Sequence, residues 1–170
     1  MTHTPGLVDA RAAALATAFR AVETTRMAGL PLLHPQLRVE AVDFQREAAE
    51  PSIALGVLLT PWFMNLMRLP LDTASEQALA AVGVRCTRRV AALDLDFLGA
   101  EEAAFGRFES CSLFSPMHAF ADQAAALATA REVLAQLRAT AVTTTPPAAP
   151  VPDRRAFLFG RRTAAEQTRS

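Results

Sequence analysis

The chain has 170 residues, of which 51% are hydrophobic and 20% charged, so it is long enough to bury one core and is expected to form a single domain with tails. Its 17 basic residues, all of them Arg, balance 17 acidic residues, which argues against a nucleic-acid or anionic-membrane partner. Two cysteines, Cys86 and Cys111, are too few for a disulfide framework. The first residues lack the pattern of a secretory signal, and we expect a cytoplasmic protein.

The first element is expected to be a helix. Thr4 is a favourable cap and Pro5 a favourable first helical residue, and Gly29 and Pro31 are expected to end the helix. Three apolar residues then share one face at helical spacing: Leu15, Phe19 and Val22.

Residues 37–46 alternate between apolar and polar side chains, which predicts a strand. Leu37, Val39 and Ala41 share one parity, whereas Val42 and Phe44 share the other. A slip of one residue moves the apolar side chains of a strand to the opposite face, so the change predicts a β-bulge near Ala41.

Residues 53–70 are the most apolar part of the chain. The continuous apolar run 53–59 predicts a central strand. Pro61 cannot donate a hydrogen bond to a sheet, so strand pairing should be disturbed there, and residues 65–69 are expected to resume as an edge strand. The proline and two polar side chains make this segment too short to span a bilayer, which needs about 20 apolar residues.

The middle of the chain predicts a short helix and two further strands. Thr73 and Glu76 have the spacing of a capping box, which predicts the start of a short helix. Alternation of Val82, Val84 and Cys86 with polar or small residues predicts a strand, and residues 105–113 predict another.

Ser115 and Pro116 repeat the cap-then-proline pattern and predict a second long helix that runs to about Arg138. The residues expected to face inward are Phe120, Ala124, Leu127, Leu134 and Leu137. The order helix, strands, helix predicts an α+β fold in which an N-terminal and a C-terminal helix pack against a mostly antiparallel sheet.

The chain is interpreted as a domain (1–138), a linker rich in Pro, Ala and Thr (139–153) and a tail rich in Arg and Phe (154–170). Disordered chains are poor in aromatic residues, so the tail cluster Arg154, Arg155, Phe157, Leu158 and Phe159 is unusual. It is expected either to dock on its own domain as a short helix or to be a second contact that folds on a partner. The reach of the linker and the high effective concentration of a tethered segment favour the second alternative.

Groups that perform catalysis or bind metals are not arranged in recognisable patterns. Cys111 and His118 lie seven residues apart across a predicted strand end and helix start, which is weak support for a nucleophile–base pair. His34, His118 and the cysteines lack zinc-site spacing. Asp94 and Asp96 alternate with apolar residues and are interpreted as a solvated strand face. We therefore predict no catalytic residue, no metal and no cofactor.

Two apolar segments without catalytic groups are interpreted as a surface for a protein partner. Successive side chains of a strand point to opposite faces, so at least one of Trp62, Phe63 and Met64 should be exposed. An exposed aromatic patch usually marks a contact site. Together with the tail, the predicted partner-binding residues are Pro61, Trp62, Phe63, Met64, Asn65, Phe114, Ser115, Pro116, Met117, Arg154, Arg155 and Phe157.

Four segments carry a resemblance to a known family: L-G-V-L-L-T-P-W-F-M-N-L-M-R-L-P (55–70), C-S-L-F-S-P-M with F-A-D-Q (111–117 and 120–123), R-R-A-F-L-F-G (154–160) and L-R-V-E-A-V-D-F (37–44). They resemble the HybE-type family of nickel–iron hydrogenase assembly chaperones, which includes the HupJ proteins. The resemblance implies an α+β fold similar to that of secretion chaperones. It also implies a cytoplasmic, non-enzymatic accessory protein that binds an immature large or small hydrogenase subunit before twin-arginine export, together with other hydrogenase accessory proteins as further partners.

The alternative interpretation is a small redox or metal-transfer factor that uses Cys86 and Cys111. Two thiolates are too few to hold a metal ion, so this function would require a dimer. Apolar neighbours around both cysteines suggest small buried hydrophobic residues, which is how free Cys usually packs.

Overall fold

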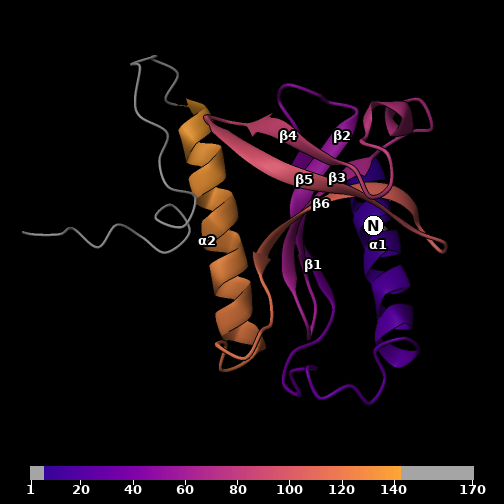
Figure 1. Ribbon diagram of the computed structural model, residues 1–170. Helices are drawn as coiled ribbons and strands as arrows, with labels where there is room; N and C mark the ends of the chain where they lie inside the picture. Colours follow the sequence, from indigo (N-terminus) through magenta and orange to yellow (C-terminus); the bar gives the residue numbers. More distant parts are fainter. Residues whose placement is uncertain (1–5, 143–170) are drawn as a thin grey trace, which may run out of the picture.

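A computed structural model describes residues 6–142, which form two helices and a six-stranded antiparallel sheet (Figure 1). The elements in chain order are α1 (Leu7–Thr24), β1 (Glu40–Arg46), β2 (Ile53–Leu59), β3 (Met64–Pro70), the 3₁₀ helix η1 (Ser75–Ala78), β4 (Arg85–Val90), β5 (Leu93–Glu102), β6 (Gly106–Phe114) and α2 (Gln123–Val142). The predicted α+β fold is therefore confirmed.

The strands lie in the order β1-β2-β3-β6-β5-β4, and each neighbouring pair is antiparallel. The interior position of β2 agrees with the prediction, but β3 lies between β2 and β6, so the prediction of an edge strand was wrong. Pro61 explains the difference, because it lies in the turn between β2 and β3 and not within the ladder. The Thr60 hydroxyl accepts hydrogen bonds from the amides of Trp62 (3.2 Å) and Phe63 (2.9 Å) and so closes this turn.

The two helices cover opposite faces of the sheet (Figure 1). On one face α1 packs against β1, over a core that includes Leu15, Phe19 and Met67. On the other face α2 packs against β1 and β2, over a core that includes Leu66 and Leu134. We call these the α1 core and the α2 core. Because both faces are covered, the interior strand β2 is apolar on both sides.

Helix α1 begins and ends at different residues from those expected. Thr4 and Pro5 lie outside the described residues; the amide of Gly6 donates to the Asp9 carboxylate (3.3 Å) at the observed start. The helix ends at Thr24, before Gly29 and Pro31. The predicted inward face is confirmed, because Leu15 and Phe19 are buried and Val22 packs against the same core.

Helix α2 begins at Gln123, so the prediction of a helix start at Ser115 and Pro116 was wrong. Residues 115–122 form a loop, in which the Phe120 ring packs on Phe114 with ring centres 5.1 Å apart. The carboxylate of Asp122 caps the helix by accepting from the amide of Ala125 (2.8 Å). Leu134 and Leu137 are buried and Leu127 is partly buried, as expected, but Ala124, in the first turn, is exposed. The helix continues to Val142, beyond Arg138.

Strand β1 contains the expected bulge two residues later than predicted. The register with β2 shifts between Val42 and Gln45, and Asp43 has a positive φ of 47°. As a result Val42 packs in the α2 core and Phe44 in the α1 core. Leu37 precedes β1 and packs in the α2 core, so it does not share a face with Val39 and Ala41.

The short helix forms, but not with the predicted cap. Asp72 and Ser75 exchange hydrogen bonds, from the Ser75 amide to the Asp72 carboxylate (2.7 Å) and from the Asp72 amide to the Ser75 hydroxyl (3.2 Å). Val82 and Val84 are exposed in a turn, and the predicted strand begins only at Arg85. The strand expected at 105–113 is confirmed by β6.

Candidate functional site

The two segments predicted to bind a partner lie side by side. Met64 at the start of β3 pairs with Phe114 at the end of β6, and the Asn65 amide nitrogen donates to the Ser110 hydroxyl (2.8 Å). The antiparallel β3–β6 pair therefore brings residues 61–65 and 114–117 to the same end of the sheet.

Most of these side chains are less exposed than expected. Trp62 is only 9% exposed and Met64 is fully buried, so the exposure inferred from strand alternation is limited to Phe63, which is half-buried. The argument failed because it assumed a solvated face, whereas Trp62 packs in the α1 core and Met64 in the α2 core. Among the remaining predicted residues, Pro61 and Met117 are buried, Asn65 and Phe114 are half-buried, and Ser115 and Pro116 are exposed.

Arg154, Arg155 and Phe157 lie outside the described residues, as do the rest of the tail and most of the linker before it. Their predicted contact with a partner stays a prediction. The family match described below includes these residues in its range but says nothing of what they bind.

His34 joins three loops at the end of the sheet that holds the candidate residues. Its amide donates to the carbonyl of Pro61 (2.9 Å), its Nε2 lies 2.7 Å from the carbonyl oxygen of Phe120, and its Nδ1 accepts from the amide of Gln36 (3.1 Å). We call this end, formed by residues 25–36, 60–63 and 115–122, the loop end. Sequence analysis did not identify Leu30 and Leu32 as site residues, yet they are 41% and 37% exposed there.

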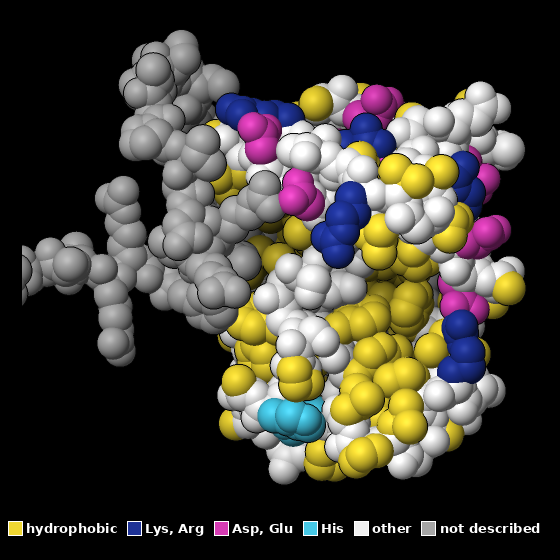
Figure 2. Space-filling model, in the orientation of Figure 1, with side chains coloured by type: hydrophobic (Ala, Val, Ile, Leu, Met, Phe, Trp, Pro, Cys, Tyr) yellow, Lys and Arg dark blue, Asp and Glu magenta, His cyan; other side chains and the backbone are white. Residues whose placement is uncertain are grey.

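A chain of aromatic rings extends from the loop end toward the β5–β6 turn. The rings of Trp62, Phe63, Phe19, Phe108 and Phe105 make successive edge-to-face contacts with centres 5.6–6.1 Å apart. Figure 2 draws one face of the molecule. Hydrophobic side chains gather over a hollowed area in its middle and lower part, with charged side chains above this area and beside it. Such apolar areas on a protein surface are suited to contact with another protein.

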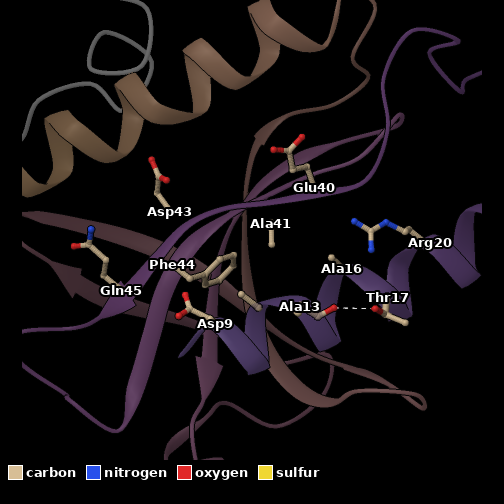
Figure 3. A pocket seen from close by; sticks show the side chains of 11 residues that line it. Asp9, Ala13, Ala16, Thr17, Arg20, Glu40, Ala41, Asp43, Phe44 and Gln45 are labelled. Carbon is tan, nitrogen blue, oxygen red and sulfur yellow. Dashed lines mark hydrogen bonds between the residues drawn. The ribbon is translucent and has the colours of Figure 1, made fainter. Parts of the chain in front are cut away.

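A separate open groove of about 540 Å³ lies between α1 and β1 (Figure 3). Its lining residues include Ala13, Ala16, Ala41 and Phe44, and Figure 3 shows Asp9 and Asp43 toward one end and Glu40 and Arg20 toward the other. Its lining thus combines small apolar side chains with charged ones.

The buried charges lie in the sheet, away from the loop end. Glu109 on β6 is fully buried and accepts hydrogen bonds from Arg68 on β3, Arg88 on β4 and the amide of Ala80 (2.6 Å). Arg68 also makes a bidentate pair with Glu47 (2.6 and 2.9 Å). Burial by itself raises the pKa of Glu109, but the hydrogen bonds from Arg88, Ala80 and Arg68 together hold that pKa below its ordinary value.

The cysteines lie on the α2 face but on strands that are not neighbours. Phe97 on β5 pairs with Cys86 on β4, and the adjacent Leu98 pairs with Ser110, the neighbour of Cys111. The two cysteines are thus separated by one strand, about 10 Å between backbones, whereas a disulfide requires Cα atoms within about 7 Å. Burial and the nearby Glu109 carboxylate raise the pKa of the Cys86 thiol, which disfavours the reactive thiolate.

The remaining predictions concern the two aspartates of β5, metal ligands and membrane-spanning segments. Asp94 is exposed on β5 and Asp96 bonds to Thr87 across the β4–β5 pair, as expected for a strand face near solvent. Within residues 6–142, no group of three or more His, Cys, Asp and Glu side chains is placed to hold a metal ion. No helix in the same range is long and apolar enough to cross a membrane.

Comparison with known proteins supports the resemblance carried by the sequence motifs. The family described as "[NiFe]-hydrogenase assembly, chaperone, HybE" matches residues 10–160. The chain is 47% identical to the protein HoxT of Cupriavidus necator over 87% of each chain. It is 42% identical to the hydrogenase expression/formation protein HupJ of Bradyrhizobium diazoefficiens over 86% of this chain and 85% of the relative.

The fold is similar to the solution structure of HybE from Escherichia coli. The TM-score is 0.51 and the alignment covers 96% of this chain and 98% of the other, with 24% sequence identity. At this identity the similarity establishes the shared fold alone. The expected family and fold are both confirmed.

Proposed function

Because the chain belongs to the HybE family of nickel–iron hydrogenase assembly chaperones, we propose that it binds an immature hydrogenase subunit in the cytoplasm and holds it until twin-arginine export. The family match over residues 10–160 is the observation that carries this proposal. The protein acts in it as an accessory protein without enzymatic activity and without a cofactor of its own.

The loop end is the surface that suits a protein partner best. It combines exposed apolar side chains with half-buried aromatic rings, and apolar and aromatic residues are typical of interface centres. The residues that form this contact surface are Leu30, Leu32, Phe63, Phe114, Pro116 and Phe120. Trp62 and Met64 support this surface from within the two cores.

Asn65 adds a polar feature next to these rings. Its amide nitrogen is bonded to Ser110, but its Oδ1 atom is buried and has no hydrogen-bond partner within the described residues. A buried acceptor without a partner is costly, so this atom is a place where an ordered water molecule would be favourable.

The test uses the two exposed leucines of the loop end. A Leu30→Ser, Leu32→Ser double variant should keep its unfolding free energy but capture hydrogenase precursor at least ~10-fold less, since interface anchors typically contribute about 2 kcal/mol each. Capture is measured by affinity pull-down from cells that make hydrogenase, with mass spectrometry of the bound chains. The bound chains also identify which subunit is recognised.

A matched control removes exposed apolar side chains elsewhere. Val84 and Leu98 are exposed on neighbouring segments at the β4 edge of the sheet, away from the loop end, at 50% and 38%. A Val84→Ser, Leu98→Ser variant should capture precursor as well as the parent protein. Equal capture by both double variants would remove the loop end as the contact surface, and failure of the parent protein to capture any hydrogenase subunit would contradict the proposed function.

A further inference from the structure

The groove between α1 and β1 borders an open edge of the sheet. β1 is the terminal strand, so a row of its backbone groups faces outward along the groove. The carbonyl of Val39 accepts from Arg20 (3.4 Å) and that of Asp43 accepts from Arg138 (2.5 Å). Within residues 6–142 no further strand pairs with β1 on this side, so the short stretch of edge between these two points, residues 40–42, is open to backbone pairing.

The groove has a floor of small apolar residues and a charged rim. Ala13, Ala16 and Ala41 leave room beside the half-buried ring of Phe44. The lining carries three carboxylates, Asp9, Glu40 and Asp43, against the single guanidinium of Arg20. Its side chains therefore suit a segment that combines large apolar residues with positive charge.

Arginines outside the lining also face this rim. Arg131 of α2 lies 3.8 Å from the Asp43 carboxylate, and Arg38 lies 3.9 Å from the Glu40 carboxylate. Arg38 and Arg131 are 71% and 58% exposed, so both pairs are weak and can exchange for other cations.

The sequence of this chain contains a segment with that composition, Arg154-Arg-Ala-Phe-Leu-Phe159. In an extended conformation, Phe157 and Phe159 project to one side, about 7 Å apart, and Leu158 projects to the other. The two rings can then lie on the alanine floor against Phe44, where aromatic pairs contribute about 0.5–1.5 kcal/mol beyond burial. The match with the HybE family model continues to residue 160, so it includes this segment.

The C-terminal helix delivers the chain to the groove. Arg138, near the end of α2, donates to the Asp43 carbonyl, and α2 ends at Val142, about one helical turn later. The 11 residues from 143 to 153 can extend about 36 Å, whereas a segment along residues 40–45 of β1 needs only about 20 Å. The segment 154–159 can therefore reach any part of the groove.

We propose that residues 154–159 of this chain dock in the α1–β1 groove as an extended segment along the open edge of β1. This inference goes beyond the proposed function and does not depend on it. It places the tail on its own domain, as an extended segment, in place of the partner contact that the sequence favoured. In this proposal the groove is a binding site for the protein's own tail, and docking attaches residues 154–159 to the folded domain.

Hydrogen exchange of the full-length protein tests the proposal. Amides of residues 156–159 and of the β1 edge should exchange at least ~10-fold more slowly than in a Phe157→Ser, Phe159→Ser variant. Leu158→Ser, which changes the opposite side of the segment, should keep most of this protection. Fast exchange of residues 156–159 in the parent protein would overturn the proposal.

Two adjacent exposed alanines of α1 give a matched test of the groove. Ala13 lines the groove and Ala14 does not. Ala13→Arg should remove the protection of residues 156–159 by filling the groove and repelling Arg154 and Arg155, while Ala14→Arg should leave it unchanged. Protection that survives Ala13→Arg would exclude this groove as the docking site.

The same measurement separates the possible occupants. Protection within one chain is independent of protein concentration, and the mass by light scattering stays that of a monomer. Protection that grows with concentration and accompanies a dimer mass would assign the groove to the tail of a second copy, contrary to the proposal. Protection that develops only when hydrogenase precursor is added would make the tail a partner contact and would equally overturn it.

Discussion

Arg68, Arg88 and Glu109 place charge inside the sheet, where removal from water is expensive. Glu109 is fully buried, and its carboxylate is satisfied by two guanidinium groups and a backbone amide. Arg68 shares its remaining donors with Glu47. Such a network is favourable only when every member is paired, because one unpaired charge in this environment costs several kcal/mol. It joins β3, β4 and β6 with the segment after β1 and so fixes how these strands are aligned.

Replacing the central carboxylate should therefore destabilise the protein strongly. Glu109→Gln keeps the shape of the side chain but leaves Arg88 without a counter-charge and Arg68 with Glu47 alone, at an expected cost of about 3–5 kcal/mol. Urea unfolding measures this difference. Asp94→Asn is the control, because the Arg89–Asp94 pair is largely exposed and should contribute less than about 1 kcal/mol. Similar losses for both variants would mean that the network contributes no more than a surface ion pair.

The lowered pKa of Glu109 gives this prediction a pH dependence. A carboxyl group whose pKa is lower in the folded state than in the unfolded state adds stability above its unfolded pKa, here near 4.5. That stability is lost as the pH falls through the folded-state pKa. The difference in unfolding free energy between the parent protein and Glu109→Gln should thus be constant near pH 7 and shrink below about pH 4.5. If this difference does not change between pH 7 and pH 3, the pKa of Glu109 is not lowered in the folded state and the prediction is wrong.

At the scale of elements, local patterns predicted which segments become helices and strands but not where they lie in the sheet. The segments 53–59 and 105–113, both predicted as strands, form them because both of their faces contact a core. The position of β3 depends on its pairing with β6, 40 or more residues away, which no local pattern specifies. The start of α2 was misplaced because the Phe114–Phe120 contact and the His34–Phe120 hydrogen bond hold residues 115–122 as a loop.

Two glycines show how closely the elements approach each other. A Cβ atom on Gly99 of β5 would lie 2.2 Å from the Ala81 carbonyl oxygen and 2.5 Å from that of Ala80. A Cβ atom on Gly56 of β2 would lie 2.4 Å from the Phe44 ring. The first neighbour is backbone in a segment that is hydrogen-bonded to Gly99 itself through Gly83 and Val84, whereas the second is a side chain that can rotate.

Gly99→Ala should consequently be more destabilising than Gly56→Ala. Overpacking in a core typically costs 1–3 kcal/mol, and we expect about 3 kcal/mol for Gly99→Ala, with faster hydrogen exchange at residues 80–84 as the loop moves off the sheet. Gly56→Ala should cost about 1 kcal/mol because its neighbour, the half-buried Phe44 ring, is a side chain that can adjust without moving backbone. Chemical unfolding and exchange of both variants measure this, and the reverse order of stability would show that the loop 80–84 yields more easily than the ring.

At the scale of the whole molecule, the candidate site was predicted in part. The two segments that meet at the loop end could be identified from the sequence, because apolar and aromatic residues without catalytic groups are recognisable without a structure. Sequence analysis overestimated their exposure, since burial of Trp62 and Met64 depends on helices that cover both sheet faces. It did not identify Leu30 and Leu32 as residues of the loop end. Their loop lies there because His34 is hydrogen-bonded to the carbonyls of Pro61 and Phe120.

The alternative function for such a molecule is redox or metal transfer through Cys86 and Cys111. The sheet separates these residues by a full strand, and the pKa of Cys86 is raised by burial and by the Glu109 carboxylate, both of which oppose thiolate chemistry within one chain. Each cysteine is half-buried and packs against the α2 core, and the Cys86 thiol also donates to the Glu109 carboxylate (3.6 Å).

A Cys86→Ala, Cys111→Ala variant should therefore support hydrogenase maturation as the parent protein does. We expect each substitution to cost no more than about 1–2 kcal/mol of unfolding free energy, because each removes one sulfur atom from a partly buried site. Hydrogenase activity is measured in cells whose own copy of the gene is replaced by the variant, with urea unfolding of the purified protein to show that it is folded. Metal analysis of the purified parent protein, at a concentration where any dimer would form, accompanies this measurement. Complete loss of hydrogenase activity from a folded variant, or a stoichiometric metal ion that the variant lacks, would favour transfer chemistry by a cysteine-bridged dimer over a chaperone that binds through its loop end.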